Sequence, residues 1–217
     1  MKDIRLVAFD WGGVILRICR SWAEGCAAAG LPAHAETLTP EMKTKRKALA
    51  ERYHVGEIDC DEFFQLASGL TGGLYSPSQV RTIHDAWLIA EYPGAAELIG
   101  ELRAKSFVQT LLLSNTNESH WVRHLPKVGG GPGDFPAVMQ LHHRLASHVL
   151  KMSKPGREIY HAAERQTGVR GANVLFFDDL IENVEAARAV GWHAEQIDHL
   201  GDTAAQMRGH LRTYGVM

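Results

Sequence analysis

The sequence predicts an α/β protein whose core is a doubly wound parallel sheet, with a small α-helical domain inserted into it. Short apolar runs alternate along the chain with longer stretches of helical period, which is the pattern of repeated βαβ units. The segment between the first two apolar runs is far too long for one crossover helix and has the period of several helices. We therefore expect two domains: residues 1–16 and 92–217 form the core, and residues 17–91 form the helical domain.

Five apolar runs are predicted to be the strands of the sheet. They are Ile4–Phe9, Phe107–Leu113, Ala137–Leu141, Val174–Phe177 and, more weakly, His193–Ile197. Three of these runs are followed directly by a polar residue, namely Asp10, Ser114 and Asp178. Ligands of open parallel sheets bind beyond the carboxyl ends of the strands. We therefore expect these three side chains to converge on one crevice.

The inserted segment is predicted to consist of helices. Their expected bounds are Arg17–Ala29, Pro40–His54, Asp59–Ser68 and Pro77–Ile89. Asp59 is placed as an N-cap, with Glu62 three residues later as its partner in a capping box. The pair Pro93-Gly94 marks the return to the core, and Ala95–Ala104 is expected to be the helix that leads into the second strand.

Composition excludes several classes of partner. The 217-residue chain is 45% hydrophobic, which is enough for a full core, and its formal net charge of −2 provides no basic field for nucleic acid or an anionic membrane surface. No apolar stretch approaches the ~20 residues that span a bilayer, so we expect a cytoplasmic protein with a small-molecule partner. Cys19, Cys26 and Cys60 lack C-x-x-C spacing and are predicted to be small packed side chains. The sequence carries no indication of the oligomeric state.

Asp10 and the glycines that follow it form the first candidate site. An aspartate at the end of a strand can simply cap its own turn. It can also be a nucleophilic carboxylate, in which case Gly12 and Gly13 allow backbone groups to approach a ligand closely.

The second and third candidate sites carry groups that bind anions. Ser114 and Asn115 are placed as the N-terminal cap of a helix, and free backbone N–H groups at such a position also bind phosphate. Lys154 precedes Pro155, which suits the first turn of a helix running through Gln166. A lysine at this entrance is either solvated or neutralises charge on an anionic substrate.

The adjacent acids Asp178 and Asp179 follow four apolar residues. Acids at the start of a helix stabilise it by interacting with the helix dipole. They also suit Mg²⁺, which takes one or two carboxylates together with substrate phosphate and water. Both interpretations remain open from these residues alone.

Four motifs in order resemble those of the haloacid dehalogenase (HAD) superfamily of phosphohydrolases. They are "FDWGGVI", "LLSNTN", "SKPGREIY" and "FFDDLIENVEAARAVGW", and the segment "GEIDCDEFF" is similar to part of a helical cap. The resemblance covers nearly the whole chain and implies a Rossmann-like catalytic core with an inserted cap domain. "FDWGGVI" and "SNTNESH" are most similar to the subgroup that includes bacterial α-D-glucose-1-phosphate phosphatase.

The resemblance implies how a phosphoryl group would be held and attacked. Asp10 is expected to attack phosphorus and form an aspartyl-phosphate. Ser114, the backbone of Asn115 and Lys154 are expected to bind the phosphoryl oxygens. Phosphoryl transfer requires mainly positioning and charge cancellation, which these groups supply.

The resemblance also implies a Mg²⁺ cofactor. Asp10, the backbone carbonyl of Gly12 and Asp178 are the expected metal ligands. Asp179 is expected to support them nearby. Asn183, one helical turn into the last motif, is expected to orient Asp178 or the helix entrance rather than to bind the metal.

Gly12 departs from most phosphatases of the superfamily, which carry an aspartate there as general acid and base. Such help is typically worth about 10²–10⁴ in rate. One explanation is a substrate with an easy leaving group, such as a sugar-1-phosphate or an acyl phosphate, or a proton supplied by water or His120. A second is a 2-haloacid dehalogenase, in which Arg17 or Arg20 would hold the substrate carboxylate. A third is a phosphate-binding protein with little turnover.

The subgroup resemblance favours the first explanation. We therefore predict a Mg²⁺-dependent phosphomonoester hydrolase that acts on a small phosphorylated metabolite, with a sugar phosphate as one candidate. Trp11 is predicted either to pack beneath the cap or to narrow the pocket on the leaving-group side. Substrate contacts in the cap could come from Arg46, Lys47, Arg52 and Tyr53, which are equally plausible as solvated residues.

Overall fold

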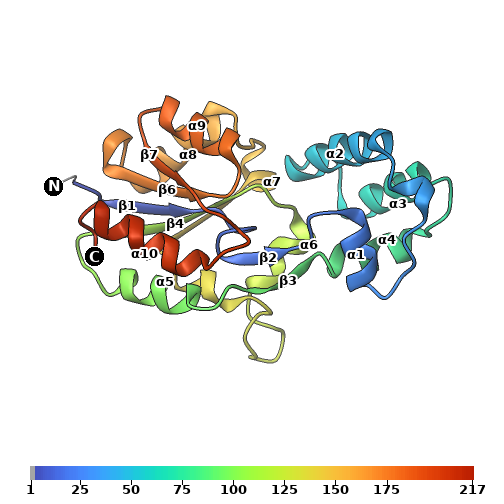
Figure 1. Ribbon diagram of the computed structural model, residues 1–217, viewed down its shortest axis with the longest axis horizontal. Coiled ribbons are helices and arrows are strands. Elements are labelled where there is room, and N and C mark those ends of the chain that lie inside the picture. Colours follow the sequence, from blue (N-terminus) through green and yellow to red (C-terminus); the bar gives the residue numbers. More distant parts are fainter. Residues whose placement is uncertain (1–2) are drawn as a thin grey trace.

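The computed structural model describes residues 3–217 and, within them, a five-stranded parallel sheet in the order β5-β4-β1-β6-β7 (Figure 1). The strands are β1 (Leu6–Phe9), β4 (Gln109–Ser114), β5 (His143–Ala146), β6 (Val174–Asp178) and β7 (His193–Gln196). In the sheet, β1 lies between β4 and β6, with Phe9 opposite Leu112 on one side and Phe177 on the other. The central strand therefore has neighbours on both edges and is completely buried.

Helices cover both faces of the sheet (Figure 1). One face packs against α5 (Ala95–Arg103) and α10 (Thr203–Thr213), and the other packs against α8 (Arg157–Thr167) and α9 (Ile181–Ala189). Alternate residues of β1 supply the two cores, because successive side chains of a strand point to opposite faces. Val7 and Phe9 belong to the first core, and Leu6 and Ala8 belong to the second. The predicted doubly wound α/β fold is confirmed.

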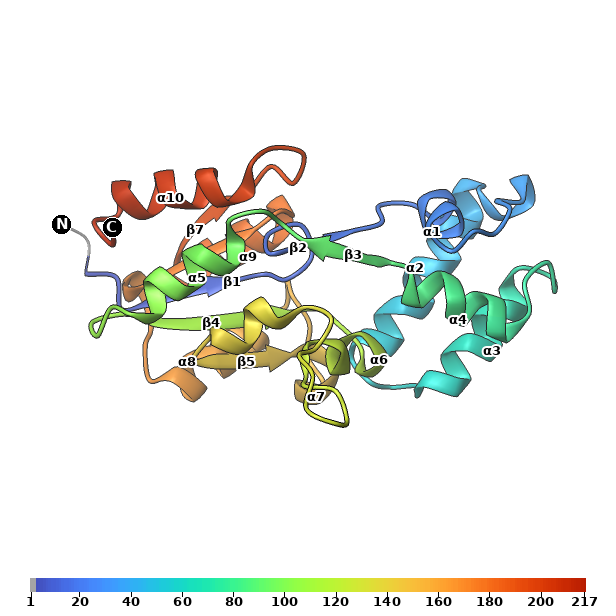
Figure 2. The same cartoon turned by 90° about the horizontal axis from the view of Figure 1, so that it is seen from below.

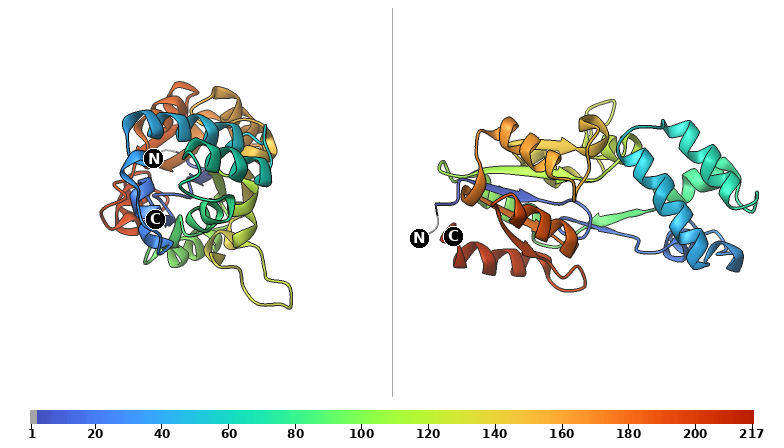
Figure 3. Two further views of the ribbon diagram at one scale, coloured as in Figure 1. Left: turned by 90° about the vertical axis from the view of Figure 1, so that its right-hand side faces the viewer. Right: turned by 90° about the horizontal axis from the view of Figure 1, so that it is seen from above.

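A helical unit lies beyond the carboxyl edge of the sheet and is joined to it by the antiparallel pair β2 (Leu16–Ile18) and β3 (Leu88–Glu91) (Figure 2). We use this name for α1 (Trp22–Ala28), α2 (Pro40–His54), α3 (Cys60–Leu70) and α4 (Pro77–Asp85). The unit has its own apolar core, in which Phe64, Tyr75 and Ile83 are fully buried. The C-terminus lies at the opposite end of the molecule from this unit (Figure 3).

The ends of two predicted helices are strands instead. The expected helix Arg17–Ala29 begins only at Trp22, after the N-cap Ser21, and the expected helix Pro77–Ile89 ends at Asp85. The residues beyond those ends pair with each other as β2 and β3. Local periodicity does not report such a pairing, because each of these short strands depends on a partner far away in the sequence.

The prediction of a strand at Ala137–Leu141 was wrong. Pro136–Gln140 forms a 3-10 helix whose Ala137 and Val138 are buried against the same core as α5, and the strand follows at His143–Ala146. This strand lies at the edge of the sheet and is only half-buried, so it needs backbone pairing with β4 more than it needs apolar side chains.

Helix starts follow the capping chemistry only in part. Asp59 Oδ1 accepts a hydrogen bond from the Glu62 backbone N–H (2.8 Å), as expected for α3. A complete capping box occurs at the start of α4, between Ser76 and Gln79. The helix after Lys154 begins at Arg157. The remaining short elements are η1 (Ala35–Thr37), α6 (Glu118–Trp121), η2 (Val122–His124), α7 (Ser147–Leu150) and η4 (Gly171–Asn173).

The helix lengths and the cysteine side chains bear on two expectations from composition. Among residues 3–217, no helix combines the length and the apolar character that crossing a bilayer requires. All three cysteines are free thiols; Cys19 and Cys26 are buried, whereas Cys60 is half-buried. Cys26 belongs to the core of the helical unit.

Leu111 on β4 tests the contribution of the sheet core to stability. It is completely buried between the sheet and α8, so Leu111→Ala is expected to lower the free energy of unfolding by about 2–5 kcal/mol through lost transfer energy and the cavity it leaves. Leu200→Ala is the matched control, because Leu200 is 85% exposed and its truncation should cost less than about 0.5 kcal/mol. Urea unfolding of both variants measures the difference, and equal effects would contradict this assignment of the core.

Candidate active site

Side chains from three strand ends meet at the carboxyl edge of the sheet. Asp10 follows β1, Ser114 ends β4 and Asp178 ends β6. The Lys154 ammonium donates to Asp10 Oδ1 and to Asp178 Oδ2, both at 2.7 Å. Lys154 is 3% exposed and Asp178 is fully buried. A buried lysine therefore bridges two buried carboxylates, as a charged group in such a place requires.

Asn115 holds the loop that carries this lysine. Its Oδ1 accepts from the Lys154 backbone N–H (2.9 Å), and its Nδ2 donates to the Lys154 carbonyl oxygen (2.8 Å). The two hydrogen bonds fix the backbone of Lys154 relative to the end of β4. This role of the Asn115 side chain has no signal in the sequence, because it depends on a loop 39 residues away.

Hydrogen bonds from the start of α9 fix the orientation of the Asp178 carboxylate. Its Oδ1 accepts from the Leu180 backbone N–H (2.9 Å) and from Asn183 Nδ2 (3.0 Å). The Asn183 carbonyl oxygen in turn accepts from the Tyr160 hydroxyl (2.9 Å). Asp178 Oδ2 accepts from Lys154 and also from Asn183 Nδ2 (3.1 Å), so α9 holds both carboxylate oxygens while Oδ2 faces the lysine.

Asp179 completes a cluster of three acids. Asp10, Asp178 and Asp179 each bring one carboxylate oxygen within 4.8 Å of the others. Asp179 Oδ2 also accepts from the Arg20 guanidinium at 2.7 Å. Carboxylate oxygens converging in this way are the ligands that a hard divalent cation such as Mg²⁺ takes. The donor set therefore fits the metal that the sequence predicts.

The two glycines after Asp10 are required for different reasons. Gly13 has φ +88°, and a Cβ there would overlap with Asp179 and Arg20, so only glycine permits this approach. A Cβ at Gly12 would lie 2.9 Å from Ile18 Cδ1. A side chain at position 12 would therefore require the end of the Ile18 side chain of β2 to shift.

The electrostatics of the cluster favour binding of a cation. Burial, together with the charges of Asp178 and Asp179, raises the pKa of Asp10 to about 7, although Lys154 opposes the shift. Burial also raises the pKa of Asp179, against the effect of Arg20. Burial opposes the charge on Lys154, but its two aspartate partners outweigh burial and raise its pKa. Negative charge at the site is thus only partly compensated by the protein.

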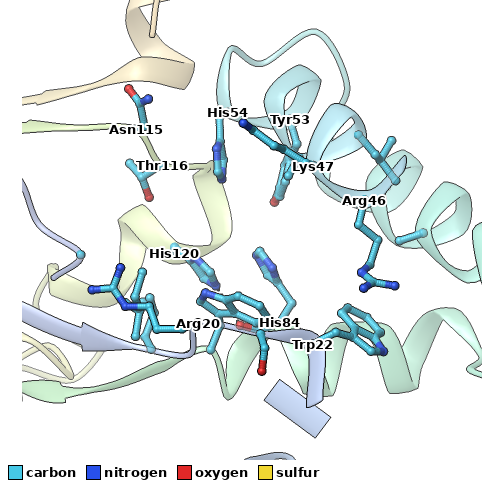
Figure 4. A pocket seen from close by; sticks show the side chains of 18 of the residues that line it. Arg20, Trp22, Arg46, Lys47, Tyr53, His54, His84, Asn115, Thr116 and His120 are labelled. Atoms are coloured by element: carbon cyan, nitrogen blue, oxygen red, sulfur yellow. Dashed lines mark hydrogen bonds between the residues drawn. The ribbon is translucent and has the colours of Figure 1, made fainter. Parts of the chain in front are cut away.

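A cavity of about 580 Å³ separates the sheet edge from the helical unit (Figure 4). The core contributes Gly12, Ser114, Asn115, Thr116 and His120 to its wall. The connection to the helical unit and the unit itself contribute mainly apolar residues together with Arg20, Lys43, Arg46, Lys47, Tyr53, His54 and His84. Of the described residues that line the cavity, none is an aspartate or glutamate.

His120 is buried and fully engaged in hydrogen bonds. Its Nε2 donates to the His84 carbonyl oxygen (2.8 Å), its Nδ1 accepts from Asn117 Nδ2 (3.4 Å), and its ring stacks on that of His84 at 3.8 Å. Burial lowers the pKa of His120 to about 3, so the ring is neutral near pH 7. This environment disfavours the predicted role of His120 as a proton donor.

Of the other residues predicted to contact substrate, some line the cavity and some are exposed to solvent. Trp11 is 2% exposed, packs edge-on against Trp121 and Phe135, and reaches the cavity only as part of its wall. Arg17 is exposed on β2. Arg52 is exposed and lies 3.6–3.9 Å from the acids Glu57 and Glu62. Trp11 is thus mainly a packing residue, and Arg17 and Arg52 lie outside the cavity wall.

His54 and His84 are cavity residues that sequence reasoning missed. His54 is the last residue of α2, and its spacing from Arg46 and Ala50 at i+8 and i+4 places all three on one face of the helix. That spacing was the available signal. His84, on α4, has no comparable signal.

A family model of haloacid dehalogenase-like hydrolases matches residues 4–191. The chain belongs to this family. A phosphatase of Mycobacterium tuberculosis, named Phosphatase MT3486, is 37% identical over 73 residues, which is 34% of this chain and 34% of that protein. The hydrolase therefore spans only about a third of the curated relative that it matches.

Solved structures share the fold at low sequence identity. A HAD-like hydrolase from Porphyromonas gingivalis has a TM-score of 0.75 and 23% identity, with 97% of this chain and 98% of that chain covered. The HAD family enzyme BT-2542 from Bacteroides thetaiotaomicron, in complex with magnesium and inorganic phosphate, has a TM-score of 0.74 and 22% identity, with coverages of 94% and 100%. L-2-haloacid dehalogenase from Xanthobacter autotrophicus has a TM-score of 0.63 and 20% identity, with coverages of 94% and 81%.

The raised pKa of Asp10 predicts a stability change on Asp10→Asn. The wild-type carboxyl has a pKa of about 7 when folded and about 4 when unfolded, so folding loses stability as pH rises from about 4 to 7. Without divalent ions, Asp10→Asn is therefore expected to be more stable than wild type at about pH 8, on the order of 2–4 kcal/mol, with a smaller difference at about pH 4.5. Urea unfolding in EDTA measures this difference.

The control for this prediction is Asp61→Asn, at a side chain that is 90% exposed on the helical unit. This variant should show little change with pH relative to wild type. A stability difference between wild type and Asp10→Asn that is the same at both pH values would contradict the raised pKa.

Proposed function

We propose that this hydrolase is a Mg²⁺-dependent phosphomonoesterase, in which Asp10 takes the phosphoryl group of a small phosphorylated metabolite and water then hydrolyses the aspartyl-phosphate. The observation that carries the proposal is the convergence of Asp10, Asp178 and Asp179 around Lys154 at the carboxyl edge of the sheet. A carboxylate nucleophile and an anionic phosphate repel each other, so a site for their reaction needs cations on both sides of the transferring group.

The metal would be held by Asp10, Asp178 and the backbone carbonyl of Gly12. When bound, Mg²⁺ supplies positive charge that offsets the nucleophile and the phosphoryl oxygens. Asp179 remains beside it, held in place by Arg20. BT-2542, which shares the fold, was solved in complex with magnesium and inorganic phosphate, and this supports the proposal of a magnesium-dependent phosphatase.

Lys154, Ser114 and Asn115 are proposed to bind the phosphoryl oxygens. Lys154 already contacts Asp10 and so lies where it can bind an oxygen of the transferring group. Ser114 is 3% exposed and lines the cavity, so its hydroxyl and the backbone N–H of Asn115 can bind further phosphoryl oxygens. The Asn115 side chain holds the Lys154 backbone in a fixed position relative to these two groups.

The helical unit is proposed to act as a cap, corresponding to the domain predicted at residues 17–91. It forms most of the wall of the cavity opposite the catalytic edge, so it excludes water and contacts the leaving group. The end of α2 is anchored to the core, because Ser147 Oγ donates to the His54 carbonyl oxygen at 2.6 Å.

The arrangement favours phosphoester hydrolysis over dehalogenation. The fold is shared with L-2-haloacid dehalogenase, but here the Arg20 guanidinium is paired with Asp179, and Arg17 is exposed outside the cavity wall. The charge of Arg20 is therefore already offset by an acid, and Arg17 lies outside the cavity wall, so neither supplies the uncompensated cation that a substrate carboxylate needs. The three clustered acids, in contrast, suit a reaction that uses a divalent cation.

Absence of a carboxylate at position 12 constrains the leaving group. Because glycine at position 12 supplies no general acid, esters whose leaving groups are already stable anions should react best. Aryl, acyl and anomeric phosphates meet this condition. The substrate of the α-D-glucose-1-phosphate phosphatase subgroup, which this sequence resembles, is one such anomeric phosphate.

The first test is phosphate release from aryl, acyl, sugar-1- and sugar-6-phosphates, together with chloride release from 2-chloropropionate, with Mg²⁺ or EDTA. Phosphate release should require Mg²⁺ and should fall by about 10³-fold or more in Asp10→Asn, because the nucleophile is lost. Asp61→Asn is the matched control and should retain wild-type rates. Metal-independent chloride release would establish a dehalogenase, and binding of phosphate without turnover would establish a binding protein.

His54 is the second candidate for proton transfer, in place of His120. Its ring lines the cavity, and within the part of the chain that the structure describes its nitrogens have no hydrogen-bond partner. Burial lowers the pKa of His54 to about 4, so the ring is neutral near pH 7 and would act as a base for the hydrolytic water rather than as a proton donor to the leaving group. His54→Gln is therefore expected to slow hydrolysis of the aspartyl-phosphate, and with it kcat, by about 10²-fold for every ester, with kcat/KM little changed.

The comparison variant is His120→Gln. It should lower stability and leave kcat close to wild type, because its ring nitrogens are already bonded within the protein. Steady-state kcat and kcat/KM of the two variants distinguish the two histidines. A loss of kcat in His120→Gln that is absent in His54→Gln would assign the role to His120.

A further inference from the structure

The cavity wall in the helical unit is largely apolar and aromatic. Its large side chains are Trp22, Leu49, Tyr53, Phe63 and Trp87. A hexose would need hydrogen-bond acceptors and donors around its ring, and in the described lining the carboxylates that would accept from hydroxyls are absent. This part of the cavity is therefore better suited to an apolar body than to a sugar.

Arg46 is a cation without a counter-ion at the far end of this wall. Its guanidinium lies 4.8 Å above the Trp22 ring, and its NH1 donates to the Thr37 carbonyl oxygen at 2.6 Å. Nowhere between residues 3 and 217 does a carboxylate approach it within salt-bridge distance. Its side chain is half-buried, and burial lowers its pKa. A desolvated cation of this kind is stabilised by an anion.

Three arginines in or near the helical unit are, in contrast, each paired with an acid. Arg20 contacts Asp179, Arg52 contacts Glu57, and Arg81 contacts Asp61. Lys43 and Lys47 accompany Arg46 in the wall at helical spacing, and Lys47 has only a 3.9 Å approach to Glu51. Positive charge is therefore concentrated on the cavity face of α2.

The two ends of the cavity lie apart. Asn115, whose side chain bonds to the backbone of the catalytic Lys154, stands at one end with Thr116, whereas Arg46 and Trp22 stand on the opposite side (Figure 4). A leaving group whose phosphate is bound at the first end would pass the aromatic wall and reach Arg46 with its distal end. The volume of about 580 Å³ is within the range for a drug-sized ligand.

We propose that Arg46, with Lys43 and Lys47, forms a second anion subsite, and that the substrate is a phosphomonoester whose leaving group has an apolar, aromatic-like body and a distal carboxylate or phosphate. This proposal rests on the proposed phosphatase activity and names its substrate class. Trp22 beneath the guanidinium holds it in place.

Three aryl esters with the same leaving oxygen test the subsite. They are para-ethylphenyl phosphate, para-carboxyethylphenyl phosphate and para-phosphonoethylphenyl phosphate, and glucose-1-phosphate is measured beside them. In wild type, kcat/KM should be at least about tenfold higher for an ester with a distal anion than for the neutral ester, because each charge-assisted hydrogen bond is worth that much. Preference between carboxylate and phosphonate identifies the distal group.

Arg46→Met should reduce this preference to about one, and Arg46→Lys should restore part of it, because the lysine keeps the charge without the planar fork. Lys45→Met is the matched control on the same helix: Lys45 contacts Glu41 and does not line the cavity, so the preference should stay as in wild type. Equal preferences in wild type and Arg46→Met, or a wild type that favours glucose-1-phosphate over every aryl ester, would overturn the proposal.

Binding gives a measurement that does not depend on turnover. The non-hydrolysable phosphonomethyl analogues of the neutral and carboxylate-bearing esters are titrated calorimetrically with Mg²⁺ present. Tighter binding of the carboxylate-bearing analogue to wild type but not to Arg46→Met supports the subsite even if no ester is hydrolysed, in which case the phosphatase activity alone fails. Equal binding of both analogues to wild type rejects the subsite.

Discussion

The Lys154 ammonium between Asp10 and Asp178 is the interaction on which the site depends. Three buried acids at one edge of a sheet would repel each other, and burial alone would drive at least one of them to protonate. The lysine offsets part of that charge, and its backbone is held by Asn115 so that the ammonium stays in place. The remaining negative charge gives the site its affinity for a cation, at a cost in the stability of the metal-free protein.

Uncharged polar side chains make a central part of the contact between the helical unit and the core. Tyr53 and His84 of the unit both bond to Ser119 of the core, and the His84 ring stacks on that of His120. Burial keeps both imidazoles uncharged near neutral pH, so two stacked rings do not repel each other. This contact holds the unit over the catalytic edge and defines the cavity between them.

The two ends of the cavity are lined by residues of different chemistry. At the catalytic end, Gly12 carries no carboxylate and lies close to the end of the Ile18 side chain, and Gly13 lets Asp179 and Arg20 approach the backbone. At the distal end, Arg46 lies over an indole without an acid beside it. The same enclosure that excludes water from the reacting phosphate therefore also strengthens the attraction of Arg46 for an anion.

Much of this architecture was present in the sequence alone. Asp10, Ser114 and Asp178 could be placed at strand ends because runs buried on both faces are nearly all apolar and stop where the polar residue begins. The helix Pro40–His54 was predicted with its observed bounds, since a proline and a cap define its start. Only the tertiary structure decided four features. They are the strand His143–Ala146, the hydrogen bonds from Asn115 to the Lys154 backbone, the pairing of Arg20 with Asp179, and the lack of an acid beside Arg46. Each of these depends on which distant residues come into contact, and the period of a local segment contains no information about that.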